Sequence, residues 1–482
     1  MILRKSSAFK FIKNVVAFVL GFYFIILMSF LYMVMTSEAT LRDVLGTNHS
    51  RDHVKEISKE IIVDTSSFDE FGGITRLTKN IIEQIAQDKK QWRFSLLLSR
   101  KNQTFLELTR LPNVRIIKVS NLFGKAQNIV FNLFNIPRDL RHSTLLLVQN
   151  MVFNLFNIPT FGLARDTLMQ IICYGNIFLD KHTDLFWDPV GGRFINDFSI
   201  PKITTIHDTI EIDMPELFND RTVCWVKERN IQGLKNSCKI TTVSEFTKRR
   251  VINIYGIDSK KIRTIPIRVA RKEKHDSDIG KARKILDKYK QQATTNNCNY
   301  IIFVSQYYPN KNHKRLIQAF ANLMKNNKKG NELMLVIVGN MSLSNGTIEK
   351  FANQFDCKNN IVFTGKVNDE ELSILLKNAL CFVHPSLYEG FGMPLVESMS
   401  SGVPIACSNV SSIPEVVGDA AVFFDPYDIS DIERAMSDLI KSPTLRNSLI
   451  KKGYTQAKKF EGPRAMIEEY IKTFEEAMNC KD

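Results

Sequence analysis

Short apolar runs alternate with amphipathic stretches along the second half of the chain. The stretches predicted as helices occupy 312–326, 346–355, 369–378 and 394–401. The apolar runs between and around them are typical of buried strands: YIIFVS, LMLVIVG, NIVFTG, CFVHPS, PIACS and AVFFDP. Strict alternation of this kind predicts a parallel sheet covered by helices on both faces. We therefore expect a Rossmann-like domain at 299–460 and a final helical segment at 461–482.

The first half opens in a similar way. IIVDTS at 61–66 and RFSLLLS at 93–99 are predicted strands, and residues 74–88 between them have the apolar spacing of a helix. This opening predicts a Rossmann-like domain over 59–265. The charged stretch that follows, at 266–298, is predicted to be an interdomain linker with one exposed helix near 279–291. The predicted fold class is thus α/β, with two doubly wound domains that face each other.

Residues 15–35 form an uncharged and mostly apolar segment that follows a basic tail at 1–14. At ~1.5 Å per residue a helix of this length spans the hydrocarbon of a bilayer. We expect a single transmembrane anchor, joined to the folded domains by a polar tether at 36–58. The alternative is a cleaved signal peptide, because Ser37 and Ala39 satisfy a small-x-small pattern.

The charges around this segment leave its orientation open. The tail carries basic residues and no acidic one, which places the amino terminus in the cytoplasm and the folded domains across the membrane. Folded domains that use a substrate made in the cytosol would instead have to lie on the cytoplasmic side. The expected location is therefore a single-pass membrane protein, either type II in the Golgi or endoplasmic reticulum or on the cytoplasmic face of a membrane.

The net charge of +15 raises the question of a nucleic-acid partner. The basic residues are dispersed and no nucleic-acid-binding motif accompanies them, so we expect no such partner. The eight cysteines form no C-x-x-C pair, and Cys381 and Cys407 fall in apolar runs, so they are interpreted as buried thiols. The one Asp-x-Asp triplet ends at Asp278 in the charged linker and is interpreted as solvated surface. We expect no metal and no cofactor.

Two nearly identical segments, QNIVFNLFNIP at 127–137 and QNMVFNLFNIP at 149–159, interrupt the first domain. Two copies are too few for a solenoid. The plain interpretation is a local duplication, and the alternative is an apolar surface that rests on lipid near a membrane-bound acceptor.

The segment HPSLYEGFGMPLVES, at 384–398, contains the strongest candidate chemistry. Glu389 and Glu397 flank a Gly-Phe-Gly turn, and Pro394 is predicted to be the first helical residue, with Glu397 in the first turn. Free N–H groups at a helix start favour a phosphate, and Gly390 and Gly392 let the backbone come close to it. The two carboxylates would accept hydrogen bonds from sugar hydroxyls. The structural alternative is an ordinary connection from a strand to a helix.

This segment resembles the retaining glycosyltransferases of family four, which have the GT-B fold and two glutamates eight positions apart around G-F-G-x-P. Three further landmarks extend the resemblance over about 60–475: FGGITR at 71–76, TTIHDTIEIDMPELF at 204–218 and FVSQYYPNKNHKRLIQAF at 303–320. A further family landmark is similar to the segment TVSEFTKRRVINIYGI, at 242–257. The resemblance implies a metal-independent transferase that moves a hexose from a nucleotide-diphosphate sugar to a glycan or lipid-linked acceptor. Mannose is the first choice for the hexose.

The resemblance also assigns roles to residues of this chain, and implies that the last helix, about 463–478, packs back on the first domain. The implied catalytic residues are His207 and Glu389. The implied donor-binding residues are Gly73, Lys311, Gly390, Phe391, Gly392 and Glu397.

Two departures from the family pattern affect donor binding and the hinge. Ser305-Gln306 stands where many members have Gly-Arg, and Ile267-Arg268-Val269 stands where Asn-Gly-Val is common. A non-catalytic carbohydrate-binding or scaffold protein with the same fold therefore remains an alternative, and a phosphorylase that uses free phosphate is a third.

Overall fold

The computed structural model describes most of the chain after residue 56. The described residues are 57–65, 73–98, 104–118, 183–191, 200–270, 278–289, 299–326, 333–340 and 344–480. The predicted basic tail, membrane span and nearly all of the tether lie outside them, as do the paired segments at 127–137 and 149–159. Among the helices of the described part, none is both long and apolar enough to cross a membrane.

The chain divides into two compact units, with the boundary near Asp184. The first unit contains three parallel strands in the order β3-β2-β1. Helix α3 follows β1 and buries Leu77, Ile81 and Ile85, the apolar positions that predicted it, whereas Ile74 is only half-buried. The elements of this unit are β1 (Lys59–Asp64), α3 (Gly73–Asp88), β2 (Trp92–Leu98), η2 (Leu106–Arg110) and β3 (Val114–Lys118).

The second unit begins with four parallel strands in the order β4-β5-β6-β7. Residues at both ends of helix α9 define its limits. The Ser244 hydroxyl accepts the Thr247 N–H at the start of the helix, and Gly256 ends it with a φ of 64°. The elements are β4 (Leu185–Asp188), β5 (Lys202–Ile206), α7 (Ile210–Asp213), η4 (Pro215–Leu217), α8 (Asp220–Lys235), β6 (Lys239–Thr242), α9 (Glu245–Tyr255), η5 (Ser259–Lys261) and β7 (Ile262–Thr264).

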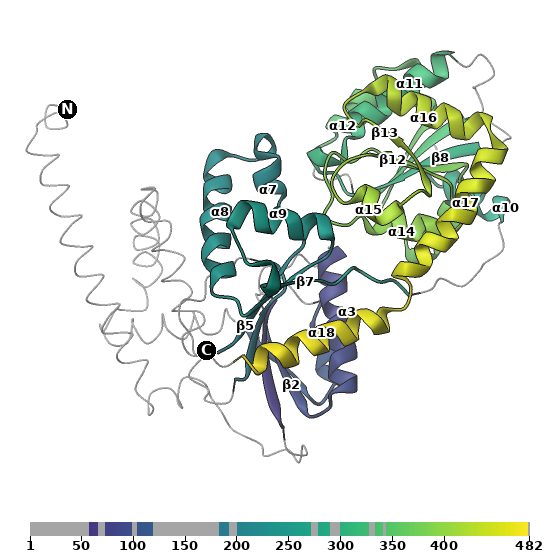
Figure 1. Ribbon diagram of the computed structural model, residues 1–482. Helices are drawn as coiled ribbons and strands as arrows, with labels where there is room; N and C mark the ends of the chain where they lie inside the picture. Colours follow the sequence, from purple (N-terminus) through teal and green to yellow (C-terminus); the bar gives the residue numbers. More distant parts are fainter. Residues whose placement is uncertain are drawn as a thin grey trace, which may run out of the picture. The chain divides into compact units, whose positions relative to one another are not determined.

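The same unit contains a six-stranded parallel sheet, in the order β10-β9-β8-β11-β12-β13, with helices between the strands (Figure 1). The predicted alternation is confirmed. The elements are α10 (Ile279–Asp287), β8 (Asn299–Val304), η6 (Pro309–Lys311), α11 (His313–Asn326), β9 (Leu333–Val338), α12 (Thr347–Ala352), η9 (Asp356–Asn360), β10 (Ile361–Gly365), α13 (Asp369–Lys377), β11 (Cys381–His384), α14 (Met393–Ser400), β12 (Ile405–Ser408), α15 (Ile413–Val417), β13 (Ala421–Phe424), α16 (Ile429–Lys441), α17 (Pro443–Ala457), η10 (Lys458–Phe460) and α18 (Pro463–Met478).

Alternate residues of these strands supply the two sides of the core. Ile301, Phe303 and Val383 pack with helices α11, α12 and α16, and α11 and α16 lie side by side in Figure 1. Cys381 and Cys407 are fully buried, as expected, and burial raises the pKa of the Cys381 thiol to about 12. Strands that are apolar on both faces are typical of parallel sheets covered on both sides.

One predicted element differs from the expectation. Helix α10 was expected to be exposed, but it ends at Asp287 and buries Ala282, Ile285 and Leu286, and it packs with α13. Because charged residues fill its other face, composition hid this narrow apolar stripe. Asp278, from the Asp-x-Asp triplet, caps the helix by accepting the Lys281 N–H at 3.0 Å.

The last helix, α18, packs against β4 and β5. The Trp187 ring lies 5.6 Å from the Tyr470 ring and 5.2 Å from the Phe474 ring, measured between centroids. Arg263 adds a polar contact by donating from Nη2 to Glu476 at 2.7 Å. The aromatic cluster therefore joins segments that are far apart in the sequence.

Phe474 is fully buried in this cluster. The substitution Phe474→Ala should lower the free energy of unfolding by about 3–5 kcal/mol, since it removes a buried ring and leaves a cavity. Urea denaturation measures the change. Lys472→Ala, at an exposed position of the same helix, is the control and should change the value by less than about 0.5 kcal/mol. Equal effects of the two variants would contradict the assigned packing.

Candidate active site

The candidate site lies at the carboxyl ends of the neighbouring strands β8 and β11. From β8 the chain continues through β9 to β10 on one side, and from β11 it continues through β12 to β13 on the other. Ligands of open parallel sheets bind at such a switch point. Lys311 ends η6 after β8, and Glu389 lies in the loop after β11.

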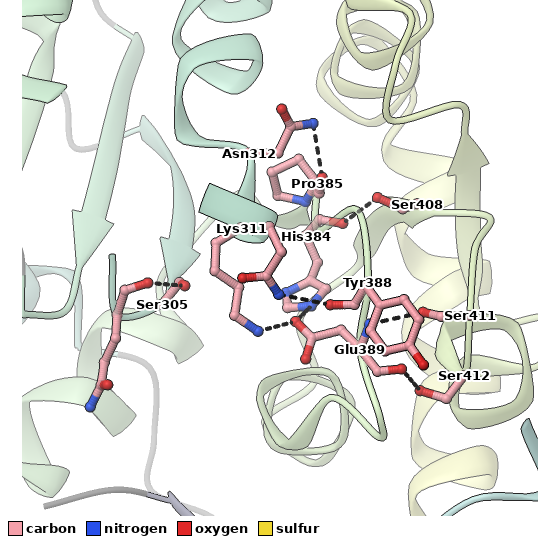
Figure 2. Close-up of polar contacts among 12 residues, drawn as sticks. Ser305, Lys311, Asn312, His384, Pro385, Tyr388, Glu389, Ser408, Ser411 and Ser412 are labelled. Carbon is pink, nitrogen blue, oxygen red and sulfur yellow. Dashed lines mark hydrogen bonds and ion pairs between the residues drawn. The ribbon is translucent and has the colours of Figure 1, made fainter. Parts of the chain in front are cut away.

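Asparagine side chains join these two loops (Figure 2). The Leu387 N–H donates to the Asn310 carbonyl at 2.7 Å, and Asn310 Nδ2 donates to the Tyr388 carbonyl at 3.0 Å. Asn312 Nδ2 donates to the Pro385 carbonyl at 3.0 Å. Because both loops are held through main-chain atoms, the positions of Lys311 and Glu389 are fixed relative to each other.

Lys311 and His384 both reach the Glu389 carboxylate, as Figure 2 shows. Lys311 Nζ lies 2.6 Å and His384 Nε2 lies 3.0 Å from the same oxygen, Oε1. The Glu389 side chain is only 11% exposed. Burial favours a raised pKa, but the Lys311 ammonium and the His384 hydrogen bond outweigh it and hold the pKa of Glu389 far below its usual range. The carboxylate is therefore ionised at neutral pH.

Two serines fix the main chain of Glu389. Its N–H donates to Ser411 Oγ at 2.9 Å, and its carbonyl accepts from Ser412 Oγ at 2.9 Å. Ser411 has a φ of 53°, in the left-handed region that few non-glycine residues adopt. Both serines lie in the loop after β12, so three successive βα loops of the sheet define the place of this carboxylate.

Gly390 brings the same loop against the segment after β5. A Cβ atom on Gly390 would lie 2.0 Å from the His207 carbonyl oxygen and 2.9 Å from the Asp208 Cβ. Ser244 Oγ donates to the Gly390 carbonyl at 2.7 Å. Only glycine fits here, for steric reasons.

The start of helix α14 differs from the prediction by one position. The helix begins at Met393, so Pro394 is its second residue and Glu397 its fifth. The prediction that Glu397 lies in the first turn was therefore wrong, because Gly392, with a φ of 93°, lets the helix start one residue earlier than proline indicated. Glu397 is half-buried, and its carboxylate has no hydrogen-bond partner among the described residues.

Phe391 was expected to contact the donor. Its side chain is 5% exposed and packs edge-on against Phe460, with 5.4 Å between ring centroids. The ring thus anchors the turn in the core. A contact with the donor would have to come from the main chain of Phe391.

His207 directly follows strand β5 and is half-buried. Its Nε2 donates to the Pro189 carbonyl at 2.8 Å, which leaves Nδ1 as the nitrogen without the proton. Burial lowers the pKa of His207, and this effect exceeds those of the Pro189 carbonyl and Asp188. His207 is therefore neutral at pH 7, and it lies next to Gly390 in the site.

Asp208 was missed as a site residue, although it follows His207 in the sequence. Its Oδ1 accepts the Ile210 N–H at 3.2 Å. Burial, and then the Glu211 carboxylate, raise the pKa of Asp208 to about 6, while Lys311 acts in the opposite direction. Asp208 is thus close enough to feel the charges of Lys311 and Glu389, and it changes charge near neutral pH.

Tyr388, which precedes Glu389, was also missed. Its hydroxyl donates to Asp213 Oδ2 at 2.7 Å and lies 2.9 Å from Thr209 Oγ1. Arg250 forms a two-point ion pair with Asp213, with 3.0 Å between Nε and Oδ2. The Tyr388 hydroxyl is buried, which raises its pKa, so it acts as a neutral donor. Its partners lie more than a hundred residues away in the sequence.

The next two cations along the chain, Lys314 and Arg315, have partners away from Glu389. Arg315 donates to Asn312 Oδ1 at 3.1 Å and lies over the Tyr427 ring, and Lys314 lies over the Phe351 ring. Ser305 Oγ donates to the Gln306 carbonyl at 2.7 Å. Lys311 is therefore the cation that this site brings to the Glu389 loop.

Gly73 is the first residue of helix α3 in the first unit. Its assignment as a donor ligand stays a prediction. Within the described ranges, no group of three or more His, Cys, Asp or Glu side chains is placed to hold a metal ion.

The raised pKa of Asp208 predicts a pH-dependent stability. Because the folded protein binds this proton more tightly than an unfolded chain, whose aspartate pKa is ~3.9, the stabilisation is present below about pH 4 and lost as pH rises through about 6. Asp208→Asn keeps an oxygen for the Ile210 N–H and carries no charge. The variant should be more stable than wild type by about 1–2 kcal/mol at pH 8, after allowance for solvent screening, and by much less at pH 4.5. Urea unfolding at the two pH values measures this, and a difference independent of pH would contradict it.

Known proteins resemble this chain in sequence and in fold. Residues 285–456 match the family model described as Glycosyl transferases group 1. The chain is 30% identical over 258 residues to the O-antigen chain mannosyltransferase B of Escherichia coli. This alignment covers 54% of this chain and 66% of that protein. It is 26% identical over 240 residues to the O-antigen chain mannosyltransferase RfbU of Salmonella typhimurium, covering 50% and 61%. The alignments thus span somewhat less than two thirds of each relative.

Solved structures share the fold at low identity. Sucrose-phosphate synthase from Thermosynechococcus elongatus has a TM-score of 0.61 at 16% identity, covering 88% of this chain and 100% of its own. Anabaena HepE, in complex with UDP-glucose, has a TM-score of 0.61 at 14% identity, covering 86% and 99%. These similarities support the predicted fold, and the family match confirms the resemblance found in the sequence. The chain therefore contains a glycosyl transferases group 1 domain, which occupies residues 285–456.

Proposed function

We propose that this chain is a retaining glycosyltransferase that transfers mannose from GDP-mannose to a glycan or lipid-linked acceptor. Both curated relatives quoted above are named mannosyltransferases. The HepE complex contains UDP-glucose, so UDP-linked hexoses are the second class of donor to test. We further propose that the transfer needs no metal or cofactor and that no nucleic acid takes part.

One observation carries this proposal: a buried, ionised carboxylate, Glu389, contacts Lys311 and lies in the loop that leads into helix α14 of a group 1 domain. A diphosphate needs cations and free main-chain N–H groups, and a sugar needs hydrogen-bond acceptors. Lys311 would supply the cation and the first turn of α14 the main-chain N–H groups. Glu389 and Glu397 would supply the hydrogen-bond acceptors for the sugar. The two requirements are thus met within one loop cluster.

These residues suggest how bond cleavage is assisted. As the bond between the anomeric carbon and the phosphate breaks, negative charge grows on the diphosphate and positive charge grows on the sugar. Lys311 would stabilise the leaving group, and the Glu389 carboxylate would stabilise the sugar from a fixed position. His207, neutral and adjacent to the same loop, would contact the sugar or a phosphate oxygen. In this scheme Glu389 either attacks the sugar or orients it.

We propose membrane attachment through residues 15–35, on the basis of their length and apolar composition. A membrane anchor would keep the domain near a lipid-linked acceptor. Either orientation remains consistent with this proposal, because the flanking charges and the cytosolic source of nucleotide sugars favour opposite sides.

A non-catalytic carbohydrate-binding protein is the second candidate. One observation favours it: Gln306 replaces a cation, and neither Lys314 nor Arg315 takes its place. Fewer charges would weaken the stabilisation of a leaving diphosphate more than the binding of a sugar. The two candidates therefore differ in turnover rather than in ligand binding.

Transfer of radiolabelled mannose from GDP-mannose by the purified full chain tests the proposed activity directly. Wild type should label a membrane glycolipid fraction, and Glu389→Gln should reduce the rate by about 100-fold or more, because the amide cannot stabilise a developing positive charge. UDP-hexoses are tested in parallel. Binding of nucleotide sugar without turnover would favour the non-catalytic candidate, and a requirement for free phosphate would favour a phosphorylase.

The role of Glu397 is tested by donor affinity. Glu397→Ala should weaken GDP binding by at least about tenfold in titration calorimetry, because a charge-assisted hydrogen bond to the ribose hydroxyls is lost. Glu370→Ala, at an exposed position at the start of α13, is the control and should bind as wild type does. Unchanged affinity of the Glu397 variant would remove this residue from the site.

A further inference from the structure

We propose that His384 is a positioning residue for sugar transfer, which holds Glu389 Oε1 so that the second carboxylate oxygen, Oε2, faces the sugar. This inference rests on the proposed function of the site. Neither the apolar strand pattern nor the paired-glutamate motif assigned a role to His384, the last residue of β11.

Aromatic neighbours fix the His384 ring. The side chain is 2% exposed. It stacks on Phe382, with 5.8 Å between centroids and 22° between ring planes, and the Phe303 ring meets it edge-on at 6.3 Å. The backbone of His384 pairs with Cys407 of the neighbouring strand β12. The direction of its Nε2–H bond is therefore set by packing before any ligand arrives.

Within the described part of the chain the imidazole makes one hydrogen bond, and that bond goes to Glu389. Because the carboxylate is ionised, Nε2 carries the proton that it donates across 3.0 Å. Nδ1 is buried and has no hydrogen-bond partner among the described residues. Burying a polar ring with an unpartnered nitrogen is unfavourable. A position that served packing alone would be better filled by an apolar side chain, so the contact with Glu389 is the feature that distinguishes this histidine.

The geometry also separates the two oxygens of Glu389. Lys311 and His384 both contact Oε1, and no described residue hydrogen-bonds to Oε2. A diphosphate that binds beside Lys311 competes with Glu389 for the ammonium group. His384 has no such competitor, because its buried ring faces the carboxylate. It therefore keeps the carboxylate oriented in the donor complex, when Lys311 turns toward the phosphate.

Two substitutions separate positioning from packing. His384→Met fills a similar volume without a donor, and His384→Gln places an amide N–H near the position of Nε2. Steady-state mannose transfer from GDP-mannose gives kcat and KM, calorimetry with GDP gives nucleotide affinity, and a thermal melt checks folding. We expect His384→Met to lower kcat by about 10- to 100-fold, as expected for one lost hydrogen bond to a charged group, with KM and GDP affinity within about threefold of wild type. If the loss in His384→Met is about 100-fold, the kcat of His384→Gln should be at least about tenfold higher than that of His384→Met.

The possible results distinguish this inference from the proposed function. A wild-type kcat in His384→Met, or equal losses in the two variants, would overturn the role of His384 while leaving the transferase intact. A rise in KM at unchanged kcat would also overturn it, since that result indicates a role in donor binding. No transfer by wild type from any nucleotide sugar would overturn the proposed function and this inference together.

Discussion

The close approach of Gly390 to the His207 carbonyl is the constraint on which the candidate site depends. With no Cβ at position 390, the loop after β11 rests directly on the backbone after β5, and a side chain of any size would push the two segments apart. Ser244 and Tyr388 then fix the contact through hydrogen bonds on either side of it. Glu389 lies between Tyr388 and Gly390 in the chain, and both of these residues are anchored, so its carboxylate is held by the same contact.

Charge within the site is balanced over a short range. Glu389 is buried yet ionised, because Lys311 neutralises it and His384 donates to it, whereas Asp208 lacks so close a cation and retains its proton to higher pH. The pKa of Glu389 is thus lowered and the pKa of Asp208 is raised, because the surroundings of the two carboxylates differ. A bound diphosphate would draw Lys311 away from Glu389 and so change both environments. If the proposed function holds, donor binding would therefore redistribute the charges of the site.

The sequence predicted most of the fold, because strict alternation of apolar runs and amphipathic stretches is compatible with few architectures besides a covered parallel sheet. The Gly-Phe-Gly turn itself drew attention to Glu389, whereas Lys311 and His207 came from the family resemblance, and their roles stay predictions. Tyr388, Asp208 and His384 were missed because their importance comes from partners that the fold brings together, as Asp213 is brought to Tyr388. The predicted start of the helix before Glu397 was wrong by one residue, because the left-handed conformation of Gly392 lets the helix begin at Met393. Phe391 belongs to a conspicuous motif, but its ring is needed in the core.

The packing of α18 on β4 and β5 has a consequence for biosynthesis. These strands leave the ribosome well before the helix that covers them with Tyr470 and Phe474. During elongation the indole of Trp187 and its neighbours must stay uncovered or be shielded by a chaperone. Nascent chains of this protein are thus prone to aggregate until α18 has been translated, and a premature stop codon near residue 460 would leave that surface permanently bare.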